Sequence, residues 1–222
     1  MQGKVGLEIG GPSGNFRDSG MLPLYRYTSR VDNCVYASET IWEGRRSEGP
    51  TFAYHPMKNN GLNFIREATD LRGLPENAYD FILSSHSIEH TANPVAALKE
   101  WMRVANPGSS FVIILPHYRH TFDHRRKPTP VSHMIADYEQ CTEETDQTHV
   151  QEVLELHDLS RDPQAGTHEQ FRSRSLNNFK NRCIHHHVFD EVNSRELLQT
   201  VGLEVEISEF VRPYHIVFLA HF

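Results

Sequence analysis

Residues 79–116 constrain the fold of this chain more than any other stretch. Residues 79–85 have the composition of a buried strand, and residues 110–116 are apolar nearly throughout, as a strand covered on both faces of a parallel sheet must be. Between them, Asn93 and Pro94 are typical of a helix N-terminus, and the apolar residues that follow recur at helical spacing. This strand, helix and strand predict a parallel sheet with a right-handed crossover.

The alternation of strands and helices continues on both sides of this unit. A helix is expected at 193–201, ending at Gly202, and further strands are expected at 5–9, 28–33, 62–68, 203–207 and 215–221. The last two strands are close enough in sequence to pair antiparallel. The predicted fold is therefore α/β: a doubly wound, mostly parallel seven-stranded sheet of the Rossmann-like type, with an antiparallel last strand.

A polar insertion interrupts this pattern after the fifth strand. Residues 117–187 contain most of the chain's 15 histidines and only short apolar clusters. A segment of this kind is expected to lie over the sheet and cover a substrate. A length of 222 residues suits one domain with a full core, so we expect a single domain over 1–222.

Charge and composition narrow the range of partners. The net charge is −7 and no stripe of Lys and Arg is visible, so nucleic acid and anionic membranes are poor partners and a small molecule is expected. No apolar run approaches the roughly 20 residues that span a bilayer, and a strand begins almost at once, which leaves no room for a signal peptide. The three cysteines are far apart, which fits reduced thiols and a cytoplasmic protein. We expect a monomer or a homodimer.

A turn rich in small residues follows the first strand. Val5 to Ile9 is apolar apart from Glu8, and Gly10, Gly11 and Gly14 follow it. Such a turn exposes backbone N–H groups to which a nucleotide-like cofactor can bind, although similar turns also serve simple chain reversal.

Two segments together resemble the class I S-adenosylmethionine-dependent methyltransferases. The first is the turn after residues 5–9, and the second runs from Asp80-Phe81-Ile82-Leu83-Ser84-Ser85-His86 through Asn93-Pro94 to Gly108. They keep the order of the family and cover the first 116 residues. The resemblance implies S-adenosylmethionine as cofactor and an enzyme that transfers its methyl group.

The resemblance also implies which residues hold the cofactor. The methionine end would lie at Glu8, Gly10 and Gly14 with the neighbouring amides of Gly11 and Ser13, the ribose at Asp32, the adenine at Glu67, Ala68 and Asp70, and the transferred group near Ser85 and His86. Pro12 departs from the family, which usually has glycine there. Because proline has no N–H, the neighbouring amides must bind the cofactor's carboxylate.

A hydroxyl acceptor would require a general base, and the insertion offers several histidines. His149 and His117 rank first and His186 next, because His117 directly follows the fifth strand and His149 has acids three residues to either side. Asp146, His149 and Glu152 would share one helix face. They form either a base with its orienting acid or the ligands of a divalent metal such as Mg²⁺.

The polarity of the insertion favours a polyhydroxylated acceptor. Residues 121–126 also resemble a bacterial branch of the family that is associated with sugar and glycan O-methylation. The leading hypothesis is an O-methyltransferase that acts on a sugar or related polyol hydroxyl, in a small molecule or an oligosaccharide. The alternatives are a carbon, nitrogen or carboxylate acceptor, a non-catalytic module that binds the cofactor, and, more distantly, an NAD-linked oxidoreductase.

Overall fold

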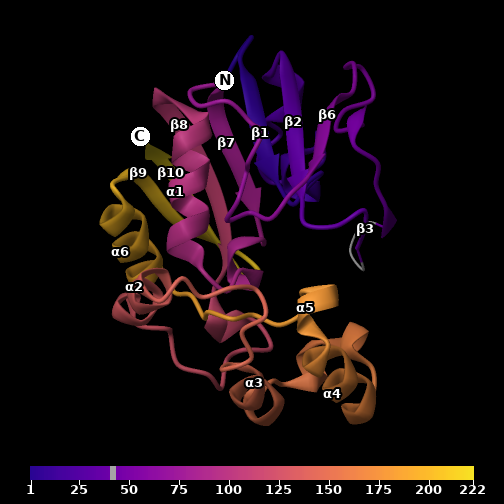
Figure 1. Cartoon of the computed structure of the whole chain (residues 1–222), viewed down its shortest axis with the longest axis vertical. Helices are drawn as coiled ribbons and strands as arrows, with labels where there is room; N and C mark the ends of the chain where they lie inside the picture. The colour runs from indigo at the N-terminus through magenta and orange to yellow at the C-terminus, as the bar shows by residue number, and fades with distance from the viewer. Residues whose placement is uncertain (41–43) are drawn as a thin grey trace.

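The computed structural model describes residues 1–40 and 44–222, and its centre is a twisted sheet (Figure 1). In the described residues this sheet has eight strands in the order β5-β6-β2-β1-β7-β8-β10-β9. Their bounds are β1 Val5–Ile9, β2 Arg30–Val35, β5 Gly49–Phe52, β6 Gly61–Ile65, β7 Tyr79–Ser85, β8 Ala105–Pro116, β9 Glu204–Val211 and β10 His215–His221. β3 (Glu39–Thr40) and β4 (Gly44–Arg45) form a separate antiparallel pair.

The strand pairing confirms the predicted architecture. β6, β2, β1, β7 and β8 are parallel neighbours, and β10 runs antiparallel to both β8 and β9. The predicted number of seven strands was wrong, because β5 adds an antiparallel edge strand beside β6. β5 contains Pro50, which an edge strand tolerates and which hides the strand from a search for alternating apolar residues.

Helices α1 (Pro94–Val104) and α6 (Glu191–Val201) pack side by side against one face of the sheet (Figure 1). The Asn93 side chain caps α1 by accepting a hydrogen bond from the Ala96 N–H, and Gly202 ends α6 in a left-handed conformation. Trp101 of α1 is fully buried in the larger core cluster. Both helices are as the sequence predicts, because their caps and apolar faces are local signals. The opposite face of the sheet is covered mainly by residues 10–28, with Phe16 and Tyr25 buried against it.

The insertion lies beyond the carboxyl ends of the parallel strands, in the lower part of Figure 1. It contains α2 Val131–Glu139, α3 Val150–Leu156, α4 His168–Leu176 and α5 Asn178–Asn181. Val150, Val153 and Phe171 belong to a small core of its own. Its two ends meet at the sheet, where His117 and Phe189 form a parallel bridge. None of the helices described is long and apolar enough to pass through a bilayer.

Candidate functional site

A cavity of about 290 Å³ opens at the carboxyl ends of β1, β2, β6 and β7. The strand order reverses between β1 and β7, and ligands of open α/β sheets bind at such a reversal. Ile9 and Gly10 form one wall, and Val35, Tyr36 and Ala68 form an apolar wall beside it. The insertion closes the cavity from the far side with two charged groups, whose contacts are described below.

Gly10 is the predicted cofactor residue that brings the main chain to the cavity wall. Its φ of +78° is a left-handed conformation that favours glycine, and its N–H donates to the Cys34 carbonyl at 2.9 Å. A Cβ atom at this position would lie 2.5 Å from the Ser87 Oγ. A side chain at this position would therefore displace Ser87 at the edge of the cavity.

Glu8, Gly11, Ser13 and Gly14 do not line the cavity. The buried carboxylate of Glu8 accepts a hydrogen bond from the Ser13 N–H at 2.9 Å and another from the Tyr25 hydroxyl at 2.6 Å. It occupies the space that a Cβ on Gly11 would need. Burial, with the Glu8 carboxylate nearby, raises the pKa of Tyr25 far above its usual range, so its hydroxyl stays a donor. Glu8 therefore holds the turn in shape instead of reaching the cavity.

Asp32, the predicted ribose ligand, is also directed away from the cavity. It lies opposite Leu7 in the register of β1 and β2, and the strand continues to Val35. Its buried carboxylate accepts hydrogen bonds from the Leu62 N–H at 2.8 Å and the Tyr79 hydroxyl at 3.2 Å. The predicted strand ended two residues too early, and Asp32 links β2 to the neighbouring strands.

Glu67 and Ala68 line the cavity, whereas Asp70 turns away and pairs with Arg72. Glu67 accepts a hydrogen bond from Arg182 at 2.8 Å. Sequence reasoning missed Arg182, because it comes from the far end of the insertion and no local pattern marks it.

Arg182 joins the insertion to the cavity wall. Its guanidinium is 2.5 Å from the Glu144 carboxylate and lies over the Tyr36 ring, 5.1 Å from the centroid. Burial raises the pKa of Glu144 to about 7, against the opposing effect of Arg182. Glu144 and Arg182 of the insertion thus close the cavity, and Arg182 also pairs with Glu67, which follows β6.

Ser85 and His86, at the end of β7, line the cavity together with His90. The His86 Nε2 lies 2.8 Å from the His215 Nδ1, and its Nδ1 lies 3.3 Å from the Glu89 carboxylate. His86 has a φ of +54°, an uncommon conformation for a residue with a side chain. His86 therefore stands between a buried carboxylate and a second imidazole.

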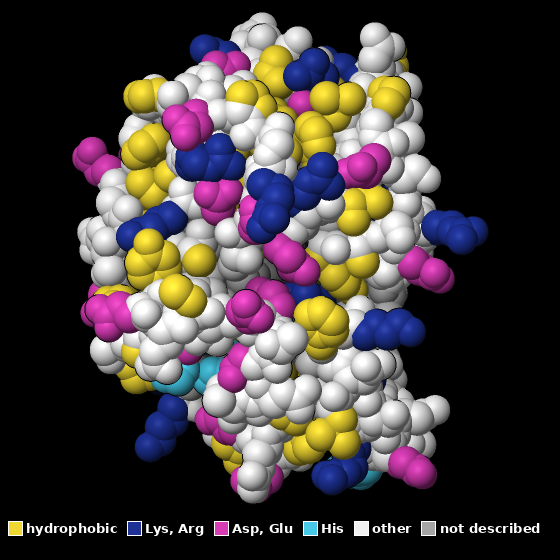
Figure 2. All heavy atoms as spheres, viewed as in Figure 1, with side chains coloured by type: hydrophobic (Ala, Val, Ile, Leu, Met, Phe, Trp, Pro, Cys, Tyr) yellow, Lys and Arg dark blue, Asp and Glu magenta, His cyan; other side chains and the backbone are white. Residues whose placement is uncertain are grey.

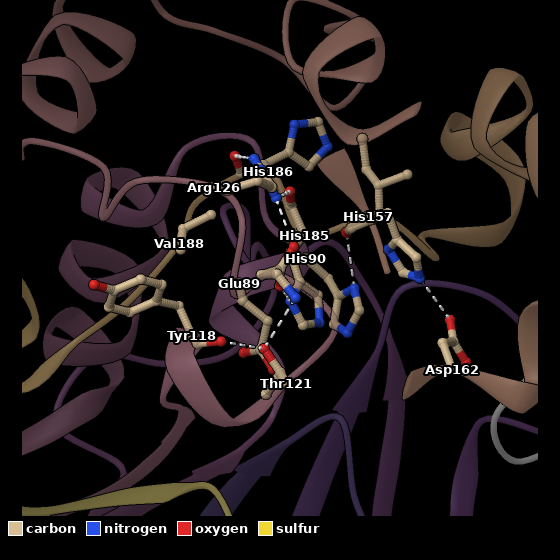
Figure 3. Close-up of polar contacts among 12 residues, drawn as sticks. Glu89, His90, Tyr118, Thr121, Arg126, His157, Asp162, His185, His186 and Val188 are labelled. Carbon is tan, nitrogen blue, oxygen red and sulfur yellow. Dashed lines mark hydrogen bonds and ion pairs between the residues drawn. The ribbon is translucent and has the colours of Figure 1, made fainter. Parts of the chain in front are cut away.

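Glu89, His90 and His185 come together close to one another (Figure 3). Burial lowers the pKa of His90 to about 4, and its Nδ1 lies 2.9 Å from the Ile184 carbonyl. Burial also opposes a charge on His185, but the Asp123 carboxylate, 2.5 Å from its Nδ1, raises the pKa of this histidine overall. A neutral His90 and a His185 that favours its charged form thus lie beside the Glu89 carboxylate.

The three histidines predicted as bases lie outside the cavity lining. His117 Nε2 is 2.9 Å from the Glu191 carboxylate, and His186 Nε2 is 3.0 Å from the Asn178 side-chain nitrogen. His149 Nε2 is 3.1 Å from the His133 Nε2. The base can therefore be sought among the histidines at the cavity.

The predicted group of Asp146, His149 and Glu152 is not assembled. Glu152 pairs with Arg126 at 3.0 Å, while Asp146 accepts a hydrogen bond from the Thr148 hydroxyl at 2.6 Å. Helix α3 begins only at Val150, so the three residues do not share a helix face.

Comparisons with known proteins agree with this geometry. Residues 45–113 match a family described as a methyltransferase domain, and no curated protein matches the sequence. An S-adenosylmethionine-dependent methyltransferase from Mesorhizobium loti superposes with a TM-score of 0.56 at 13% identity, covering 100% of this chain and 92% of the other. An S-adenosylmethionine-dependent methyltransferase from Methanosarcina mazei superposes with a TM-score of 0.54 at 14% sequence identity, and the match covers 100% of this chain and 93% of the other. Another from Aquifex aeolicus superposes with a TM-score of 0.51 at 16% identity, and the match covers 99% of this chain and 82% of the other. This chain therefore has the fold of the S-adenosylmethionine-dependent methyltransferases.

Proposed function

We propose that this protein is an S-adenosylmethionine-dependent methyltransferase whose acceptor is a hydroxyl of a sugar or related polyol. The observation that carries the proposal is the cavity at the reversal between β1 and β7, with Gly10 at its wall. The match to a methyltransferase domain over residues 45–113 supports it independently.

The walls of the cavity differ in a way that suits this donor. Val35, Tyr36 and Ala68 offer an apolar surface for the adenine, and the backbone at Gly10 offers polar groups for the methionine end. Glu67 is the predicted adenine-side acid that lines the cavity. The donor supplies an activated methyl group on a positively charged sulfur.

Methyl transfer to a hydroxyl needs alignment and a proton acceptor. The acceptor oxygen forms a bond to the methyl carbon as the carbon–sulfur bond breaks, the sulfur leaves as neutral S-adenosylhomocysteine, and the hydroxyl proton passes to a base. We assign the base to His86, whose Nδ1 faces the Glu89 carboxylate at 3.3 Å; its Nε2, which lies 2.8 Å from the His215 Nδ1, would accept the proton when the acceptor hydroxyl takes the place of His215. Glu89 would stabilise the imidazolium that results.

The proposed acceptor class is supported by the residues on the side of the cavity that the insertion forms. Glu144 and Arg182 are charged, and His90 and Thr91 add polar groups that can hydrogen-bond several hydroxyls. The exposed face in Figure 2 carries Lys and Arg interspersed with Asp and Glu, without the single-sign field that favours nucleic acid. A small molecule or an oligosaccharide therefore fits better than a polyanion.

Calorimetry tests the donor directly. We expect S-adenosylmethionine and S-adenosylhomocysteine to bind with dissociation constants between about 1 µM and 1 mM, a range typical of enzyme ligands. NAD should give no heat of binding above its dilution. Binding of NAD alone would overturn the proposal. Donor binding without methylation in a panel of sugars, amines and carboxylic acids would favour a non-catalytic module.

The base is tested by His86→Asn, because asparagine tolerates a positive φ. We expect the variant to lower kcat about 100-fold on a hydroxyl acceptor, the usual cost of losing a general base, with less than a tenfold change in donor affinity. His117→Ala serves as the matched control and should keep kcat within a few fold of the wild-type value. If His86→Asn leaves kcat unchanged, or methylates an amine or carboxylate at the full rate, the base and the hydroxyl acceptor are rejected.

A further inference from the structure

Four side chains of the insertion and its last residues converge away from the cavity lining. His133 and Asp137 are one turn apart on α2, His149 immediately precedes α3, and His187 is the last residue of the insertion. The His133 Nε2 lies 3.1 Å from the His149 Nε2 and 3.5 Å from the Asp137 Oδ2. The His187 Nε2 lies 3.0 Å from the same Asp137 oxygen. Three imidazoles thus lie together, and the Asp137 carboxylate adjoins two of them.

The ring nitrogens of the three histidines are close enough to share one metal ion. With metal–ligand bonds of about 2.0–2.1 Å, the ligand atoms of a tetrahedral zinc site are about 3.3–3.4 Å apart. The separation of the His133 and His149 Nε2 atoms is close to this value, and one ring nitrogen from each of the three histidines lies within 4.8 Å of the others. Histidine nitrogen and carboxylate oxygen are ligands that zinc accepts.

The surroundings suit a bound cation. His187 is fully buried, while the His133 side chain is 41% exposed, so an ion can enter from that side. Figure 2 shows histidine side chains at the surface between α2 and α3. The Thr142 hydroxyl donates to the other Asp137 oxygen, Oδ1, at 3.3 Å, which helps to hold this carboxylate beside the histidines.

The protonation of the histidines agrees with this geometry. Burial lowers the pKa of His149 to about 4, and burial also lowers the pKa of His187. Both imidazoles are therefore neutral near pH 7, which is the form that binds a metal. The cluster of Glu89, His90 and His185 is less suited, because Asp123 raises the pKa of His185 and favours its protonated ring.

We propose that His133, His149 and His187 bind one Zn²⁺ ion, with the Asp137 carboxylate beside His133 and His187. The ion joins α2, the start of α3 and the chain that returns to the sheet. The Asn93 side chain donates to the Asp137 carbonyl at 3.1 Å, and the Thr91 backbone adjoins His187, so the site braces the segment behind the cavity.

Zinc binding to the full chain tests this proposal, after a chelator has removed metal and been dialysed away. We expect one Zn²⁺ per chain by elemental analysis and titration calorimetry, together with a rise in Tm on zinc addition. Cobalt substitution should give the intense visible absorption of a tetrahedral site. His133→Ala, a partly exposed position that is safe for folding, should weaken zinc affinity at least about 100-fold.

Two variants separate this site from its alternatives. Glu89→Gln alters the other histidine cluster and should leave zinc affinity unchanged, whereas Asp137→Asn should weaken it. Circular dichroism of each variant reports whether the fold is retained. The proposal is overturned if the wild-type chain binds no zinc, if His133→Ala and Asp137→Asn bind it as the wild type does, or if only Glu89→Gln loses it. None of these readouts depends on the proposed function.

Discussion

Replacing Gly10 by valine (Gly10→Val) is expected to weaken S-adenosylmethionine binding at least about 100-fold, which corresponds to about 2.7 kcal/mol. A Cβ at this position would lie 2.5 Å from the Ser87 Oγ, and the remaining side chain would take space from a cavity of about 290 Å³. Overfilling a packed site costs about 1–3 kcal/mol, and the backbone must also move away from the ligand. Titration calorimetry on the folded variant measures the effect.

Gly73→Val is the matched control for this experiment. Gly73 also has a positive φ, +88°, but a Cβ there would meet nothing within 4 Å, and the residue does not line the cavity. The control therefore carries the same backbone strain without the obstruction. It should bind the donor as the wild type does. Equal donor affinities in the two valine variants would mean that the donor does not approach Gly10.

Glu8→Ala is expected to lower the free energy of unfolding by about 3 kcal/mol, a large part of the stability of an ordinary domain. The substitution removes the acceptor of the Ser13 N–H and of the buried Tyr25 hydroxyl, and it leaves a cavity against Gly11. Hydrogen bonds to an ionised group contribute about 1.5–3 kcal/mol each, and a buried donor left without a partner adds a desolvation cost. Urea unfolding followed by circular dichroism measures the change.

Two further variants give this second prediction its controls. Glu76→Ala changes an exposed glutamate and should alter the unfolding free energy by less than about 0.5 kcal/mol. Tyr25→Phe combined with Glu8→Ala should cost less than the sum of the two single changes, because both remove the same hydrogen bond. Additive costs would contradict the assigned role of Glu8 as the anchor of the turn.

The elements that the sequence predicts well are those with local signals. Helix α1 has its cap at Asn93 and an apolar face, and β8 is apolar along residues 110–116, so both could be read without knowledge of the fold. β5 could not, because its four residues include a glycine and a proline and it is formed by pairing with β6. Edge strands of this kind depend on their neighbour more than on their own composition.

The boundary of β2 shows how a small shift in a strand end changes where a predicted site residue lies. The sequence suggested an end at Asn33, but Cys34 and Val35 continue β2, and the cavity begins beside these later residues. Asp32, three residues before the end of β2, bonds to the neighbouring strands and does not line the cavity. Strand ends are poorly marked wherever polar residues are buried inside a sheet, as Asp32 and Asn33 are.

The contacts made by the insertion could not be predicted from the sequence for a different reason. His187 meets Asp137, and Arg182 meets Glu67, across separations of 50 and 115 residues. A single sequence carries no periodicity that links such pairs. Local spacing around His149 instead suggested Asp146 and Glu152 as partners, which the late start of α3 rules out.

The bridge between His117 and Phe189 has a consequence for how this molecule can change. The Tyr118 N–H donates to the Phe189 carbonyl at 3.0 Å, and the Thr129 N–H donates to the Val188 carbonyl at 2.9 Å, so the chain departs from the scaffold and rejoins it at one place. Loop entropy grows only slowly with length when the ends are already together. Residues 119–187 could therefore be exchanged or changed in length while the sheet and its helices stay as they are.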